Sequence, residues 1–240
     1  MENMTDKQFN TYGIIAAMDK ELDLIKEEIK FEDSVVVSGM TFYMSHINDK
    51  NIVFVKCGVG KINAAICTEL LIDRFKVDCV INTGVAGALN NDLDIGDIVI
   101  SKSAVMHDMD VTGLGYKIGQ TPGLAVVEFE ANDYLVKCIE KVIDKLSLNI
   151  KYIVGGVASG DQFVSSKIDK ERILKYFDVD CVEMEGASIA QVCYINNIPF
   201  VIIRSMSDKA DDTGQVDYKT FSDNSAKNSA KIVVNFIKSK

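Results

Sequence analysis

Two carboxylates stand two residues apart at Glu183 and Glu185, where a short apolar run meets a stretch of small residues. Burying an unpaired carboxylate costs several kcal/mol, so each needs a cation, a hydroxyl or helix-terminal amides as a partner. The hydroxyl groups of a bound ligand would serve. The alternative interpretation is that both side chains cap the helix that follows.

An arginine, Arg204, interrupts the apolar run 200–206, which otherwise has the composition of a buried strand. A buried guanidinium requires anionic neighbours. Glu21, Glu183 or Glu185 could supply them, either within a site or as a structural ion pair.

Further acidic residues follow expected strands at Glu21 and at Ser207-Asp208. In open α/β sheets, small ligands bind beyond the carboxyl ends of the strands, so chemistry is expected there. Glu21 has a simpler interpretation as well, because acidic residues in a first helical turn complement the helix dipole.

Two glycine-bearing segments also follow expected strands. The first, residues 56–61, departs from the dinucleotide fingerprint at Asn63, and no P-loop pattern occurs in the chain, so neither a nicotinamide nor a P-loop nucleotide is favoured. The second, residues 82–87, is expected to be a turn whose Gly84 and Gly87 let the backbone approach a ligand or itself.

Short β-branched runs alternate with amphipathic segments, which predicts an α/β fold around one mixed or mainly parallel sheet. The expected strands are Tyr12–Ala17, Thr41–Ile47, Asn51–Lys56, Cys79–Thr83, Ile98–Ala104, Tyr152–Ala158, Cys181–Glu183 and Phe200–Met206. The expected helices are Lys20–Lys30, Ile62–Arg74, Asn132–Leu146, Lys167–Tyr176, Gly186–Asn196 and Tyr218–Lys238.

No linker divides the 240 residues, so a single domain is expected, with residues 1–10 as a disordered polar extension. Two long loops are expected. Residues 107–123 hold four glycines and suggest a lid or a contact with another subunit, and residues 208–217 form the second loop.

The composition excludes several classes of partner. With 26 Lys and Arg against 35 Asp and Glu, the net charge of −9 repels nucleic acids and anionic lipids. No apolar run is long enough for a membrane span, and no export signal is expected. Six scattered cysteines and two histidines predict reduced thiols in a cytoplasmic protein, with no metal site.

Eight motifs occur in an order that resembles the 5′-methylthioadenosine/S-adenosylhomocysteine nucleosidases, within the nucleoside phosphorylase superfamily. The resemblance extends along nearly the whole chain. The motifs are Gly13-Ile14-Ile15-Ala16-Ala17-Met18 with Glu21, Gly58-Val59-Gly60-Lys61, Asn82-Thr83-Gly84-Val85-Ala86-Gly87, Gly96-Asp97-Ile98-Val99, His107-Asp108-Met109-Asp110-Val111-Thr112, Ser159-Gly160-Asp161-Gln162-Phe163, Val182-Glu183-Met184-Glu185, and Arg204-Ser205-Met206-Ser207-Asp208.

The resemblance implies a three-layer α/β/α homodimer that needs no cofactor and hydrolyses the bond between adenine and ribose. It assigns Asp208 as the acid that protonates N7 of adenine and Glu21 as the base that activates water, with Arg204 helping to hold the water and the carboxylates. For Asp208 to donate, its pKa must rise above the roughly 3.9 of a free aspartate, so Lys209 is expected to face water.

The resemblance also implies the walls of a nucleoside site. Glu185 would accept the ribose hydroxyls, beside Met184. Phe163 would stack on adenine, with the backbone of Val164 reading its edge. The 5′-thio pocket would be formed by Val59 and Tyr218, and by Leu114 and Pro122 of a partner subunit. The other expected lining residues are Val85, Ala86, Gly87, Glu183 and Ser207.

One position departs from the family pattern, because Val85 stands where these nucleosidases usually carry a serine that touches the water. Rival functions are a purine nucleoside phosphorylase and a nucleoside sensor. A phosphorylase needs cations for phosphate, and residues 81–89 contain none, with Asn82 at the position of an expected arginine. A sensor would be expected to lack Glu21 or Asp208, and both are present.

Overall fold

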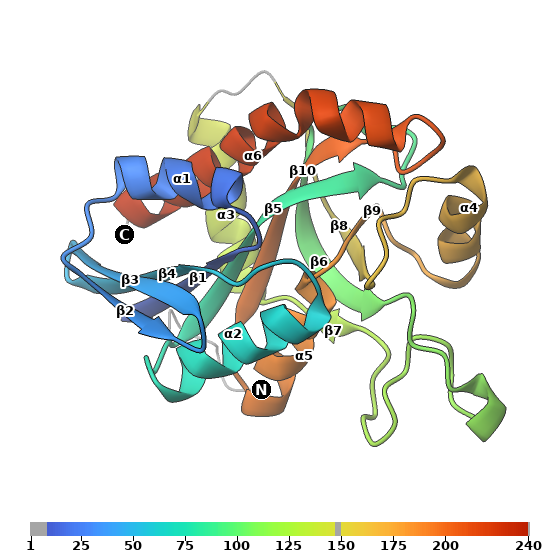
Figure 1. Ribbon diagram of the computed structural model, residues 1–240, viewed down its shortest axis with the longest axis horizontal. Helices are drawn as coiled ribbons and strands as arrows, with labels where there is room; N and C mark the ends of the chain where they lie inside the picture. The colour runs from blue at the N-terminus through green and yellow to red at the C-terminus, as the bar shows by residue number, and fades with distance from the viewer. Residues whose placement is uncertain (1–8, 147–149, 240) are drawn as a thin grey trace.

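A mixed β-sheet forms the centre of the computed structural model, which describes residues 9–146 and 150–239 (Figure 1). Its strands are β1 (Thr11–Ala16), β2 (Asp33–Val37), β3 (Met40–Ile47), β4 (Lys50–Lys56), β5 (Cys79–Ala88), β6 (Ile98–Met106), β7 (Phe129–Glu130), β8 (Tyr152–Ser159), β9 (Cys181–Glu183) and β10 (Phe200–Asp208). The helices are α1 (Asp19–Glu28), α2 (Lys61–Asp73), α3 (Asp133–Leu146), α4 (Lys167–Tyr176), α5 (Gly186–Asn196) and α6 (Gly214–Lys238), with a short 3₁₀ helix η1 (Thr112–Leu114).

The strand order is β10-β6-β8-β9-β5-β1-β4-β3-β2, with β7 paired to β6. β10 also pairs with β5, so five of these strands close into a ring at one end of the sheet. Because β1, β4, β5 and β10 run parallel to one another, their carboxyl ends meet at one edge. This edge is where the acidic side chains predicted above emerge.

Helices cover both faces of the sheet, as the three-layer prediction requires. In Figure 1, α1, α3 and α6 lie on one face and α2 and α5 on the other. Each face buries its own apolar cluster, one containing Leu71 and Ile189 and the other Ile139 and Phe236. Burial of these side chains holds the strand ends in place.

The expected turn at residues 82–87 is wrong, because this segment continues strand β5 to Ala88. The two glycines serve a different purpose there. A methyl group at Gly84 would overlap the side chains of Arg204 and Glu21, and one at Gly87 would overlap Asp208. The glycines therefore make room inside a strand for functional side chains.

Three other expectations need correction. The pattern of β-branched segments did not predict two strands. These are β2, whose side chains are largely exposed, and β7, which has two residues. The expected loop 208–217 is shorter, because β10 ends at Asp208 and α6 begins at Gly214. Phe9 is buried and the Asn10 amide donates to Asp78, so these two residues are not a disordered extension, and residues 1–8 lie outside the described part.

The remaining features agree with the expected outline. Residues 107–123 form an irregular segment that carries η1 and projects from the body in Figure 1. Within residues 9–146 and 150–239, no helix combines the length and the apolar character that crossing a bilayer demands.

Truncating a core side chain of α3 tests the layer packing. Leu135, Ile139 and Ile143 recur at helical spacing on the buried face. Ile139→Ala should lower the free energy of unfolding by about 2–5 kcal/mol, because it leaves a cavity against the sheet. Lys137→Ala, on the exposed face of the same helix, should change it by no more than about 0.5 kcal/mol. Urea unfolding followed by circular dichroism measures both, and equal effects would contradict the packing.

Candidate active site

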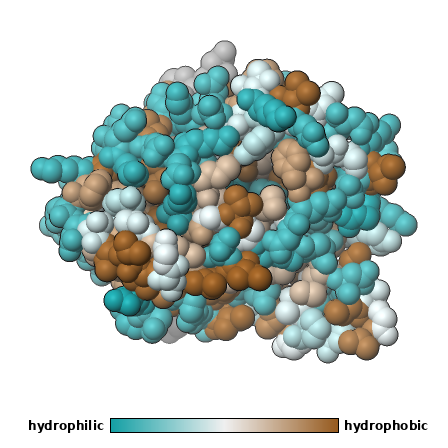
Figure 2. Space-filling model, viewed as in Figure 1, coloured by the Kyte–Doolittle hydropathy of each residue, from teal (hydrophilic) through white to brown (hydrophobic). Residues whose placement is uncertain are grey.

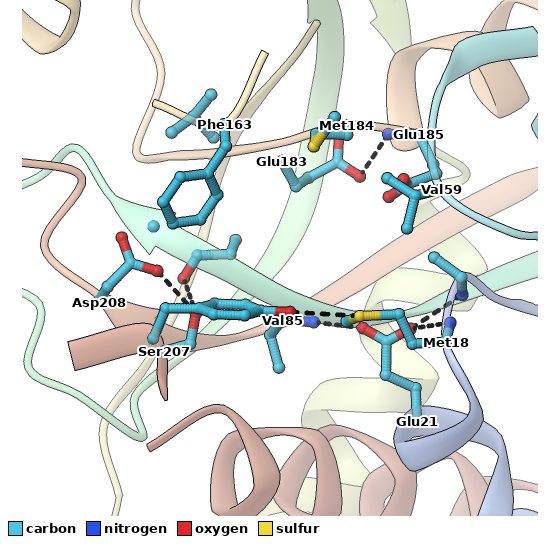
Figure 3. Close-up of a pocket in the computed structure, with 15 residues that line it drawn as sticks. Met18, Glu21, Val59, Val85, Phe163, Glu183, Met184, Glu185, Ser207 and Asp208 are labelled. Carbon is cyan, nitrogen blue, oxygen red and sulfur yellow. Dashed lines mark hydrogen bonds between the residues drawn. The ribbon is translucent and has the colours of Figure 1, made fainter. Parts of the chain in front are cut away.

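A largely apolar cavity lies where the carboxyl ends of the strands meet (Figure 3). It encloses about 470 Å³, part of it open to solvent. Residues from the ends of β1, β5, β9 and β10 form its floor, and loops and α6 complete it. The lining residues are Ala17, Met18, Glu21, Val59, Val85, Ala86, Gly87, Phe163, Val182, Glu183, Met184, Glu185, Ser207, Asp208 and Tyr218.

Arg204 lies behind this cavity and is 1% exposed. Its Nη2 atom donates to Glu183 and to Asn82 and lies 3.8 Å from Glu185 Oε2. Burial by itself lowers the pKa of Arg204, but the surrounding carboxylates raise it above its ordinary value. The buried arginine therefore has the anionic neighbours that its sequence context required.

Glu183 has its oxygens occupied by protein donors. Besides Arg204, it accepts the Ser159 hydroxyl and the amides of Glu185 and Gly186 at the start of α5. The helix-capping interpretation therefore holds for this acid, which also anchors Arg204. Glu183 lines the cavity, but the hydrogen bonds of its carboxylate are made to protein groups.

Glu185 is placed differently, with its carboxylate exposed to the cavity. Its Oε1 accepts the Gly60 amide at 2.8 Å, which ties the loop carrying Val59 to the start of α5. Burial, together with the neighbouring Glu183, raises the pKa of Glu185, and Arg204 opposes that rise. A hydroxyl-bearing ligand would find an acceptor here.

Glu21 points from the first turn of α1 towards the cavity and is buried. Its Oε2 accepts the amides of Ala17 and Met18 at 2.8 and 2.9 Å, and its Oε1 accepts the amide of Val85 at 3.2 Å. Burial raises the pKa of Glu21, while Arg204 and these amides lower it. The side chain caps its helix and faces the cavity at once, so both sequence interpretations apply.

Asp208 lies across the cavity from Glu21, with Val85 between them in Figure 3. An irregularity in the pairing of β10 with β5 falls between Met206 and Asp208. The Ser207 hydroxyl donates to Oδ2 at 2.8 Å and the Ala210 amide to Oδ1 at 2.9 Å. Burial is the main cause of the raised pKa of Asp208, and the nearby acids Asp217 and Asp211 add to it.

Lys209 turns away from the cavity, as expected. Its ammonium donates to Asp94 Oδ1 at 3.0 Å and to the carbonyl of Leu93. This orientation removes a cation that would otherwise favour the ionised form of Asp208.

Aromatic and thioether groups form the outer wall. Phe163 and Tyr218 meet edge to face with ring centroids 5.4 Å apart, and the Tyr218 hydroxyl donates to Met18 Sδ at 3.2 Å. Val59 completes this wall from the loop before α2. The arrangement offers a flat apolar surface near Asp208 and an apolar, sulfur-containing surface near Glu21.

The structure gathers most, but not all, of the predicted residues. Val164 lies in a small adjoining hollow with Phe163 and Asp208. Leu114, which is 77% exposed, and Pro122 lie on the projecting segment and do not line the cavity of their own chain. The prediction omitted three lining residues, although their positions at or just beyond strand ends signalled them: Ala17, Met18 and Val182.

Among residues 9–146 and 150–239, no three side chains of His, Cys, Asp and Glu are grouped as metal ligands. Glu21 and Asp208 line one cavity, and this geometry supports the chemistry of paired carboxyl groups around a bound organic molecule.

Comparison with known proteins agrees with this fold. The model of the phosphorylase superfamily matches residues 11–238. A 5′-methylthioadenosine/S-adenosylhomocysteine nucleosidase of Desulfotalea psychrophila is 44% identical over 227 residues, which cover 94% of this chain and 96% of that protein.

Two solved structures show how closely the fold is shared. The same kind of nucleosidase from Neisseria meningitidis, in complex with methylthio-immucillin-A, has a TM-score of 0.92 and 38% identity over 96% of this chain and all of that one. Futalosine hydrolase of Helicobacter pylori has a TM-score of 0.91 and 31% identity, covering 96% and 98% of the two chains. The chain belongs to the phosphorylase superfamily and, within it, to the 5′-methylthioadenosine/S-adenosylhomocysteine nucleosidase family.

The raised pKa of Asp208 has a consequence for stability. A native pKa above the unfolded value means that stability is present at low pH and is lost as the pH rises from about 3.9 through the native pKa. Asp208→Asn should therefore gain in melting temperature relative to the unsubstituted protein as the pH rises above about 3.9, and the gain should level off once Asp208 is ionised in the native state.

Asp211 provides the control of opposite sign. The Thr213 amide donates to its carboxylate and lowers its pKa, so its ionised form stabilises the native state above the unfolded pKa. Asp211→Asn should be less stable than the unsubstituted protein by a margin that is fully present above about pH 3.9 and therefore stays constant between pH 4.5 and 8.5. A margin for Asp208→Asn that is constant or shrinks with pH, measured by differential scanning calorimetry, would contradict the assigned shift.

Proposed function

We propose that the protein hydrolyses the N-glycosidic bond of 5′-methylthioadenosine and S-adenosylhomocysteine, releasing adenine and the 5′-thio-substituted ribose. The observation that carries the proposal is the pair of buried carboxyl groups, Glu21 and Asp208, that face one apolar cavity from different sides. The similarity to the Neisseria nucleosidase, whose structure holds a methylthio-immucillin, supports the choice of substrate.

Asp208 acts as the general acid in this proposal. Its raised pKa keeps a proton on the carboxyl group at higher pH than in a free aspartate, so the group can donate to N7 as adenine leaves. Donation neutralises the charge that builds on the departing base. Phe163 would stack on adenine, and the backbone of Val164, a residue that lines the same hollow, would read its edge.

Glu21 acts on the other reactant, water. The carboxylate accepts a proton from water as the oxygen attacks the anomeric carbon, where positive charge has built up in an oxocarbenium-like transition state. The amides of Ala17, Met18 and Val85 hold the carboxylate in one orientation. Because Val85 has no hydroxyl, water placement relies on Glu21, with Arg204 contributing positive charge from behind the wall.

Glu185 holds the sugar between these two groups. Its carboxylate faces the cavity beside Met184 and would accept the 2′- and 3′-hydroxyls. The thioether of Met18 and the ring of Tyr218 then meet the 5′ end. An apolar surface at this position favours a 5′-thioether over a 5′-hydroxyl.

Water is favoured over phosphate as the nucleophile. None of the fifteen cavity-lining residues is a lysine or an arginine. The nearest guanidinium, that of Arg204, is engaged by Glu183 and Asn82. A phosphate dianion beside Glu21 and Glu185 would meet carboxylates without compensating cations.

The active unit is a homodimer in this proposal, with Leu114 and Pro122 lent to the neighbouring site. Exposed apolar side chains on α2, α5 and η1 support it, namely Ile62, Ile66, Tyr194, Ile195 and Leu114. Figure 2 shows hydrophobic residues in the region where Figure 1 draws α2. Apolar surface of this kind marks protein interfaces.

Substituting the two catalytic carboxyl groups tests the mechanism. Asp208→Asn and Glu21→Gln should each remain folded and lower kcat by about 10²–10⁴-fold, because each removes one proton transfer. Adenine release from both thioether nucleosides, with and without phosphate, measures the effect, and circular dichroism checks the fold.

Three results would contradict the proposal. A pentose 1-phosphate among the products would make the protein a phosphorylase. Preferred cleavage of futalosine would give the protein the substrate for which the Helicobacter pylori hydrolase is named. Near-normal turnover by either variant would remove that residue from the mechanism.

A charge at the apolar face tests the dimer. Ile62→Asp on α2 should give mainly monomers in light scattering, and turnover should fall because the partner's side chains no longer reach the site. Ile168→Asp is the matched control, since Ile168 on α4 is equally exposed, at 79% against 74%, but lies away from that face. A dimeric Ile62→Asp variant would contradict the assigned interface.

A further inference from the structure

A buried lysine that the mechanism does not use contacts the residue that follows Asp208. Lys170 on α4 is only 7% exposed. Its ammonium donates to the carbonyl of Ala88 and to the carbonyl of Lys209, both at 2.9 Å. The described residues place no carboxylate within ion-pairing distance of it, so main-chain oxygens take most of its charge.

Placing an ammonium here is costly. Burial lowers the pKa of Lys170, and Lys209 acts in the same direction, while Asp211 and Asp208 oppose the shift. The same region holds an apolar cluster that includes Leu89, Ile173 and Ala210, where an apolar side chain would lose no hydration. A purely structural contact would not require a cation at this position.

The two carbonyls identify what the lysine connects. Ala88 is the last residue of β5, and Lys209 immediately follows Asp208 at the end of β10. These strand ends flank the irregularity that precedes Asp208, where Gly87 pairs with Asp208 itself. The end of β10 is also held by its pairing with β5 and by the Ser207 hydroxyl, which donates to the carbonyl of Ala86, but only Lys170 joins the carbonyls of Ala88 and Lys209 among the described residues.

We infer that Lys170 is a positioning residue for the general acid: its ammonium clamps the ends of β5 and β10 and so aims the Asp208 carboxyl group into the cavity. This inference rests on the proposed function, since Asp208 is the acid only if adenine is the leaving group. A displacement of about 1 Å in a catalytic group can cost on the order of 10²-fold in rate.

The charge of Lys170 has a second effect on Asp208. The other charged groups near this carboxyl group are Asp211, Asp217 and Lys209, and the ammonium of Lys209 is directed to Asp94. Asp208 raises the pKa of Lys170, so by the same interaction the ammonium of Lys170 favours the ionised form of Asp208. Removing that charge should shift the loss of activity at alkaline pH to higher pH, because Asp208 would keep its proton longer.

Lys170→Met tests the inference, since methionine keeps the length and apolar stem and removes both the charge and the donors. We expect kcat at neutral pH to fall by about 10- to 100-fold, with KM changed by less than about threefold, and the alkaline limb of kcat to move to higher pH. Lys167→Met is the matched control, because that side chain is 72% exposed on the same helix and its ion pair is with Glu171 on the surface. It should leave kcat, KM and the pH profile unchanged.

A second variant separates the clamp from the charge. Lys170→Gln keeps an amide NH2 group as a hydrogen-bond donor without the charge, so it should recover part of the lost kcat while keeping the shifted alkaline limb. It also serves if Lys170→Met fails to fold. A folded variant of either kind with the rate and pH profile of the unsubstituted protein would overturn the inference. Failure of the unsubstituted protein to release adenine would instead overturn the proposed function.

Discussion

The burial of Arg204 within the sheet constrains the rest of the site. A guanidinium without water must be matched by carboxylates at short range, and removing one partner of such a group typically costs about 3–5 kcal/mol. Glu183 provides the direct partner, Glu185 lies 3.8 Å away, and Glu21 contributes at longer range. The interaction that stabilises the strand ends therefore also assembles the acids of the cavity.

The same constraint separates the two catalytic carboxyl groups by environment. Glu21 lies within the field of Arg204 and accepts three amides, which favour its ionised form against the effect of burial. Burial also raises the pKa of Asp208, the Ser207 hydroxyl and the Ala210 amide oppose that rise, and the acids Asp217 and Asp211 add to it. The pKa of both carboxyl groups is raised, but a cation opposes the rise for Glu21 and nearby acids reinforce it for Asp208, which suits the first to be the base and the second the acid.

Periodicity and motif order predicted the layers of the fold well. The segments that they predicted wrongly show what a sequence alone does not reveal. The bounds of α4, α5 and β9 match the expected segments. The glycines of β5 indicated a turn, since a sequence does not show that their missing side chains make room for Arg204 and Asp208 from other strands. The exposed β2 carried no alternating pattern that could be recognised.

The acidic side chains also show that the sequence alone does not reveal which partners a residue will have. Glu183 and Glu185 have the same chemistry two residues apart, and only the fold shows that one is saturated by Arg204, Ser159 and helix amides while the other faces the cavity. The role of Lys170 had no sequence signal, because it depends on two main-chain carbonyls from distant strands.

The most direct test of the account is a crystal structure with a non-cleavable carbon-linked analogue of 5′-methylthioadenosine, grown with phosphate present. The account predicts the purine N7 within about 2.7–3.2 Å of an Asp208 oxygen, the ribose hydroxyls on Glu185, and a water between Glu21 and the anomeric carbon. A phosphate ion bound at that water position, or a purine placed away from Asp208, would contradict it.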